Sequence, residues 1–159
     1  MNRWMMHAMV VICCVIVGQV QAQTAGDIMF VVDESGSMGG EHAWLGPMVA
    51  GSGGLEAEMV GAGVGSGANP NLYSLIGYGA SNPAPRKISV DSGDWGSASG
   101  FNSATGSLLT NGGTEDGYEA IKFGLDNYSF RGVGSNLINL VTDEDRDVRD
   151  SSINYASLL

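Results

Sequence analysis

Residues 27–37 read DIMFVVDESGS, an apolar run that stops abruptly at a short polar loop. A nearly continuous apolar run of this length is typical of a strand buried on both faces of a parallel sheet. The loop that follows carries one carboxylate and two hydroxyls at alternating positions, on Asp33, Ser35 and Ser37. The stretch therefore predicts a central buried strand with oxygen-bearing side chains just beyond its carboxyl end.

Segments with strand-like and helix-like patterns alternate along the rest of the chain. We expect further strands at 72–78, 87–90 and 137–142, and helices at 42–60, 94–109, 114–127 and from 147 onward. Residues 51–54 should interrupt the first helix, because each glycine there costs about 1 kcal/mol relative to alanine. Strands alternating with helices predict an α/β fold with an open, mostly parallel, Rossmann-like sheet flanked by helices.

The first residues have the pattern of a secretory signal peptide. Arg3 precedes an apolar stretch at 9–17, which is shorter than the roughly 20 residues a membrane span needs, and small residues follow near Ala22. We expect a signal peptide at 1–22, a single domain at 23–159, and a secreted, extracellular protein. Both cysteines, Cys13 and Cys14, lie in the leader, so the domain should rely on its apolar core instead of disulfides.

The composition is strongly acidic. The chain has 17 acidic side chains against seven basic ones and a formal net charge of −10. Such a surface repels nucleic acid and anionic membranes and attracts cations. We therefore expect neither nucleic acid as a partner nor a membrane span in the mature chain, and the second apolar stretch that a span would require is absent from the sequence.

Three polar clusters fall at expected strand ends or helix starts, at 33–37, 112–114 and 142–143. In open α/β sheets, ligands bind beyond the carboxyl ends of the strands, at the point where the chain reverses its winding direction. All three clusters offer oxygen, and neither nitrogen nor sulfur. Oxygen ligands favour hard cations, so we expect Mg2+, with Mn2+ or Ca2+ as alternatives.

On these motifs the sequence resembles the von Willebrand factor A (vWA) domain family and its metal-ion-dependent adhesion site (MIDAS). Asp33-x-Ser35-x-Ser37 fits the first motif of the family, Gly113-Thr114 the second and Thr142-Asp143 the third, with Asp147 four residues later. The resemblance implies a metal site formed by Asp33, Ser35, Ser37, Thr114 and Asp143. It implies that the serines bind the metal directly, that Thr114 does so directly or through water, and that the aspartates act mostly through bound water.

The resemblance also implies a function. The metal of such a site accepts a carboxylate from an Asp or Glu of a protein ligand, so the chain is expected to be an adhesion or recognition module and not an enzyme. Domains of this family usually continue with further strands and a closing helix, so the domain at 23–159 is expected to be incomplete at its C-terminus. Separately, Asn127-Tyr128-Ser129 is an N-glycosylation sequon, which makes Asn127 a candidate glycosylation site.

Two other functions remain open from the sequence. The first is a vWA domain that serves matrix assembly without using a metal. The second is a metal-assisted hydrolase, whose general base would have to be Glu34, Glu144 or Asp145. We expect these three carboxylates to be solvated loop residues, and we expect Asp147 to cap the last helix.

Overall fold

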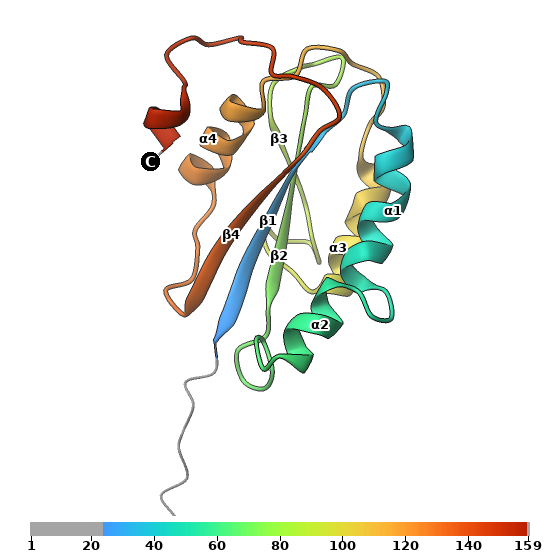
Figure 1. Ribbon diagram of the computed structural model, residues 1–159, viewed down its shortest axis with the longest axis vertical. Coiled ribbons are helices and arrows are strands. Elements are labelled where there is room, and N and C mark those ends of the chain that lie inside the picture. Colours follow the sequence, from blue (N-terminus) through green and yellow to red (C-terminus); the bar gives the residue numbers. More distant parts are fainter. Residues whose placement is uncertain (1–23, 159) are drawn as a thin grey trace, which may run out of the picture.

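The computed structural model describes residues 24–158, so the expected signal peptide at 1–22 lies outside the described residues and stays a prediction. The elements follow the order strand, helix, helix, strand, strand, helix, helix, strand (Figure 1). Their bounds are β1 Ala25–Asp33, α1 Gly39–Ala50, α2 Leu55–Gly61, β2 Leu72–Tyr78, β3 Arg86–Ile88, α3 Ala98–Ala104, α4 Gly117–Asn127 and β4 Gly134–Val141, with short 3-10 turns at Thr105–Ser107 and Tyr155–Leu158.

The four described strands form one sheet in the order β3-β2-β1-β4. β1 pairs in parallel with both β2 and β4, and only the short edge strand β3 runs antiparallel to its neighbour β2. This confirms the predicted α/β class and the mostly parallel sheet. Because β2 and β4 lie on opposite sides of β1, the winding direction reverses at β1, and the crevice of such a sheet opens at the carboxyl end of this strand.

Every residue of β1 is buried, which explains its uninterrupted apolar run. Ile28, Phe30 and Val32 face the core beneath α1 and α3, whereas Met29 and Val31 face the core beneath α4. Figure 1 shows the same two layers, with α1, α2 and α3 on one side of the sheet and α4 on the other. A strand covered on both faces needs apolar side chains at successive positions, because neither face meets water.

Close packing brings α4 onto the sheet at Gly124. A Cβ placed at this position would lie 2.6 Å from the Sδ of Met29 and 3.0 Å from the Cδ1 of Ile76. The glycine therefore lets the helix axis approach the strands more closely than a side chain would allow. This contact fixes the helix whose N-terminus adjoins the carboxyl ends of β1 and β4.

Several helix boundaries differ from those predicted. The break at 51–54 is confirmed, since it separates α1 from α2. The helix expected from Asp94 begins only at Ala98, because the Ser97 hydroxyl accepts the cap hydrogen bond from the Gly100 N–H. Asp94 instead forms an ion pair with Lys87 at 2.6 Å.

The largest difference between the predicted and observed elements lies in the segment after β4. Within residues 24–158, the helix predicted from Asp147 is absent. Residues 142–154 form a loop instead, and Tyr155–Leu158 form a 3-10 turn. The loop is held by Asp116, whose carboxylate accepts hydrogen bonds from the Arg146 side chain at 2.6 and 3.0 Å and from the Arg149 N–H at 2.9 Å. These tertiary bonds replace the local bonds a helix would make.

Within residues 24–158, no helix combines the length and the apolar character needed to cross a membrane. β4 is an edge strand of the described sheet, and its Leu137 and Leu140 side chains are exposed.

Candidate metal site

Asp33 is the last residue of β1, at the carboxyl end of the central strand, and its side chain is fully buried. Its Oδ1 accepts a hydrogen bond from the Ser35 N–H at 2.7 Å, and its Oδ2 accepts one from the Thr142 hydroxyl at 2.9 Å. The backbone oxygen of Asp33 lies 2.7 Å from Nε2 of His42, on α1. Each carboxylate oxygen keeps a free lone pair, so Asp33 can still accept hydrogen bonds from water.

Ser35, Ser37 and Asp143 continue the same network. The Ser37 hydroxyl donates to Oδ1 of Asp143 at 3.1 Å, so the 3.0 Å contact between the two serine oxygens has Ser35 as its donor. Ser35 is buried, while Ser37 and Asp143 are exposed. The structure thus brings four of the five predicted ligands together, and Ser37 and Asp143 lie on the solvent-exposed side of this network.

The fifth predicted ligand, Thr114, lies on the neighbouring loop. This loop is tied to the serine loop by a 3.1 Å hydrogen bond from the Gly36 N–H to the Gly112 carbonyl. Thr114 is exposed, and its side chain makes no hydrogen bond within residues 24–158. It does not cap α4, since Asp116 accepts the cap bond from the Glu119 N–H. The structure therefore places Thr114 beside the network without joining it to the other four.

Gly112 explains how the two loops come so close. A Cβ at this position would lie 1.8 Å from the backbone oxygen of Gly79, so only glycine fits. Gly112 also forms a parallel bridge with Ser35. The backbones at the carboxyl ends of β1 and β2 and the loop before α4 thus pack in direct contact.

The surroundings of Glu34 differ from those predicted. It is not a solvated loop carboxylate, because its side chain has an exposed fraction of 0%. Arg86 binds both of its oxygens, with Nε 2.9 Å from Oε2, and the Leu109 N–H donates to Oε1 at 2.8 Å. Glu34 therefore anchors β3 and the loop at 108–111 beneath the site, and Arg86 binds this one of the three carboxylates that the hydrolase hypothesis could use as a base.

Glu115 is a site neighbour that the sequence did not reveal. Burial, followed by the negative charges of Asp33, Glu144 and Asp147, raises the pKa of Glu115 to about 7. Glu144 and Asp145 are exposed, as expected. Asp147 does not cap a helix: its N–H donates to the Glu115 carbonyl at 2.8 Å, and its Oδ2 accepts from the Glu115 N–H at 3.3 Å. A carboxylate flanked only by polar loop residues gives no sequence signal of burial.

The charge balance of this end of the sheet is one-sided. All six lysines and arginines of residues 24–158 form ion pairs with acidic partners: Glu34, Asp94, Asp126, Asp27, Asp116 and Glu119. In the described chain, the carboxylates at the site have none of these cations as a partner: Asp33, Glu115, Asp143, Glu144, Asp145 and Asp147. The site therefore carries uncompensated negative charge, which favours a cation from outside the chain.

The donor set fits a hard divalent cation. It comprises carboxylate and hydroxyl oxygens, the ligand types that Mg2+, Mn2+ and Ca2+ take in proteins. Within residues 24–158, no group of three or more histidine, cysteine or acidic side chains is placed to hold a metal. The predicted ligand set has a different composition, because it combines two aspartates with three hydroxyls.

The candidate glycosylation site lies at the C-terminal end of α4, and the candidate metal site adjoins the other end of this helix. Asn127 is the last residue of α4 and is exposed, and its Nδ2 donates to the Phe123 carbonyl at 2.9 Å. Its glycosylation stays a prediction.

Comparison with known proteins identifies the fold through solved structures. No protein family and no curated protein sequence matches the chain. Among solved structures, proximal thread matrix protein 1 of the mussel byssus, whose MIDAS motif is occupied by zinc, superposes with a TM-score of 0.60 at 14% identity over 83% of this chain and 32% of that protein. The von Willebrand factor domain of the type V pili tip protein Mfa5 from Porphyromonas gingivalis superposes with a TM-score of 0.56 at 16% identity over 86% of this chain and 44% of that one.

The chain thus spans less than half the length of these structures. At such low identity the similarity establishes the fold, independently of the three motifs in the sequence. The chain has the fold of the von Willebrand factor A domains.

Proposed function

We propose that this protein is a secreted recognition module that binds a divalent cation at the carboxyl end of β1 and uses it to capture a carboxylate of an extracellular protein. The observation that carries the proposal is the hydrogen-bonded network of Asp33, Ser35, Ser37 and Asp143, which joins the ends of two parallel strands at the point where the winding direction reverses.

Each residue has a role consistent with its surroundings. Ser35 and Ser37 would hold the cation directly, with Thr114 as a third hydroxyl from the adjacent loop. Asp33 and Asp143 would hold its water ligands, since Asp33 already accepts two hydrogen bonds from the chain and keeps lone pairs free. A cation with few direct anionic ligands remains strongly electrophilic, and this is the chemistry it supplies to an incoming carboxylate.

Mg2+ is the cation that we propose, because its preference for oxygen and for retained waters matches a set of hydroxyls and outer carboxylates. Mn2+ and Ca2+ share the oxygen preference. The zinc-occupied motif of the byssus protein makes Zn2+ a further cation to be compared. Secretion is supported by the leader pattern and by the byssus and pilus-tip proteins that share the fold.

We propose binding and not catalysis as the activity. Of the three carboxylates that a hydrolase could use as a general base, Glu34 is bound by Arg86 and by the Leu109 N–H, which leaves only Glu144 and Asp145. Metal-independent assembly, the role a matrix protein could have, is the other outcome of the experiment below.

Two synthetic peptides that differ in one group test the proposal. One carries a single Glu between glycines and the other carries Gln at that position, and both have blocked termini. We expect the full chain to bind the Glu peptide in Mg2+, as detected by nuclear magnetic resonance titration, and to lose this binding in EDTA. Binding of both peptides with equal affinity, or binding that survives EDTA, would contradict a metal-held carboxylate and favour metal-independent assembly.

A further inference from the structure

A pocket of about 140 Å3 opens directly beside the candidate metal site. It shares Thr142 with the site, and its wall continues into Glu144, the residue that follows Asp143. Its lining comprises Tyr78, Glu115, Gly117, Tyr118, Leu140, Thr142, Glu144, Asp145 and Arg146. A Cβ at Gly79 would lie 3.1 Å from both the Oδ1 of Asp33 and the Cγ of Glu115, which places the buried acid of the pocket next to the buried acid of the metal site.

Glu115 makes this pocket more than a group of surface acids. Only 3% of the residue is exposed, and its side chain lines the pocket. Glu144 lines the same pocket, and no lysine or arginine of residues 24–158 pairs with either residue. Two acids that meet at a pocket wall without a cation between them favour a cationic group from a ligand.

Arg146 does not compensate this charge. Its guanidinium binds both oxygens of Asp116, at 2.6 and 3.0 Å, and lies over the Tyr118 ring, 4.5 Å from its centre. The pocket therefore contains three acids, Glu115, Glu144 and Asp145, and one arginine whose charge is neutralised by a carboxylate outside the pocket.

The remaining walls are apolar and aromatic, from Tyr78, Tyr118 and Leu140. A long basic side chain suits such a pocket, because its methylene stem packs on apolar surface while its charged head reaches polar groups. A second bare metal ion suits it less well, because residues 24–158 hold no cluster of three or more acidic, histidine or cysteine side chains placed to bind one.

We infer that this pocket receives an arginine or lysine of the same ligand whose carboxylate approaches the metal, so that the recognised element is an acid next to a base. The inference rests on the proposed function for the position of the carboxylate, and it adds the chemical class of the ligand. A cation and a carboxylate held at adjacent sites would select basic–acidic segments over purely acidic ones.

Citrulline, the neutral isostere of arginine, provides the test. A panel of blocked peptides carries one Glu and one Arg, placed one, two or three positions to either side of it, and each has a twin with citrulline in place of Arg. Their affinities for the full chain are measured in Mg2+ and in EDTA. We expect at least one Arg peptide to bind about tenfold more tightly than its twin, the gain typical of one charge-assisted contact.

Two exposed residues make the assignment specific. Glu144→Gln should reduce the difference between the Arg peptide and its twin to about twofold or less, and Asp145→Asn should reduce it in part. Glu58→Gln removes an equal charge from α2, at the opposite end of the molecule, and should leave the difference unchanged.

The outcomes separate this inference from the proposed function. Mg2+-dependent binding with equal affinity for Arg and citrulline twins would overturn the pocket assignment and leave the metal function standing. A preference for Arg that persists in EDTA would support the pocket while contradicting the metal function. No binding of any peptide, or an Arg preference unchanged in Glu144→Gln, would overturn the inference.

Discussion

Asp33 and Glu34 are sequence neighbours with opposite roles. Asp33 faces the candidate cation site and is held by neutral donors, whereas Glu34 points beneath it and is neutralised by Arg86. Both side chains are fully buried, so each depends on the partners that it finds. The alternation of side chains along an extended backbone separates the two functions within a single dipeptide.

Removing the partner of Glu34 should destabilise the fold. We expect Arg86→Met to lower the free energy of unfolding by about 3 kcal/mol, because it leaves a fully buried carboxylate without its cation. Lys122→Met is the matched control: its pair with Asp126 is exposed on both sides and should cost less than about 1 kcal/mol. Urea denaturation measures both, and equal losses in the two variants would contradict a structural role for the buried pair.

Two adjacent glycines give a sharp test of loop packing. Gly112→Ala should lower the free energy of unfolding by about 2 kcal/mol and weaken cation binding, because the new Cβ meets the Gly79 carbonyl and pushes the two loops apart. Gly113→Ala should be nearly neutral, since no atom lies within 4 Å of its Cβ position. Thermal unfolding and calorimetric Mg2+ titration report the two effects, and similar behaviour of the two variants would refute the packing argument.

At the scale of elements, α4 and the loop after β4 depend on one side chain. Asp116 caps α4 and also binds Arg146 and Arg149. Burial would raise the pKa of Asp116, but these hydrogen bonds and the charge of Arg146 outweigh it and hold the pKa at about 2. The loop that carries Asp143, Glu144 and Asp145 toward the site is thus fastened to the start of the helix.

A comparison of two helix caps measures how much the bonds of Asp116 to this loop stabilise the fold. Ser97→Ala should cost about 1 kcal/mol of unfolding free energy, the usual value for a lost cap at α3. Asp116→Ala should cost about 3 kcal/mol of unfolding free energy, because it also leaves Arg146 without its carboxylate partner and removes the hydrogen bonds that hold the loop at 142–154. Hydrogen exchange should show faster exchange of the Arg149 amide in Asp116→Ala. If the two variants lose equal stability, Asp116 acts as a cap alone.

The sequence predicted the elements that are defined by local pattern. β2 has the predicted bounds, and the break between α1 and α2 falls at its glycines, because buried runs and glycine breaks are local properties. Four of the five predicted ligands lie close together, because parallel strands bring their carboxyl ends to one edge; their binding of a metal stays a prediction. The segment from Asp147 to 154 was wrongly predicted as helical, since its conformation depends on Asp116, about 30 residues earlier. Glu34 was misjudged for the same reason, as Arg86 is 52 residues away.

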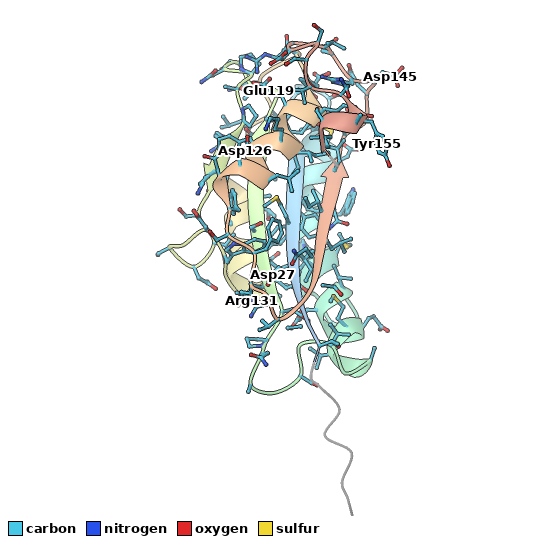
Figure 2. All side chains as sticks on the ribbon, turned by 90° about the vertical axis from the view of Figure 1, so that its left-hand side faces the viewer. Asp27, Glu119, Asp126, Arg131, Asp145 and Tyr155 are labelled. Atoms are coloured by element: carbon cyan, nitrogen blue, oxygen red, sulfur yellow. The ribbon has the colours of Figure 1, made fainter. Side chains whose placement is uncertain are left out.

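At the scale of the whole molecule, charge is distributed unevenly between the two ends of the sheet. At the lower end Asp27 forms an ion pair with Arg131, which Figure 2 shows near the start of β1, and Glu58 of α2 has no basic partner in residues 24–158. The upper end, where Figure 2 shows Asp145 beside the tip of β4, contains acids that have no basic partner in residues 24–158. Six acids without a basic partner in residues 24–158 thus lie where the polar loops meet: Asp33, Glu115, Asp143, Glu144, Asp145 and Asp147.

We propose that the polar loops at the carboxyl ends of β1 and β4 hold a divalent cation, and calorimetric titration of the full chain with Mg2+ measures this binding. We expect saturable binding at one site, unchanged in Glu58→Ala and weakened at least about tenfold in Asp143→Ala, the lower end of the effect expected for residues that orient metal ligands. Zn2+, Mn2+ and Ca2+ titrations under the same conditions rank the cations. Equal Mg2+ binding by the chain and by Asp143→Ala, or no binding by the unaltered chain, would show that these loops form no such site.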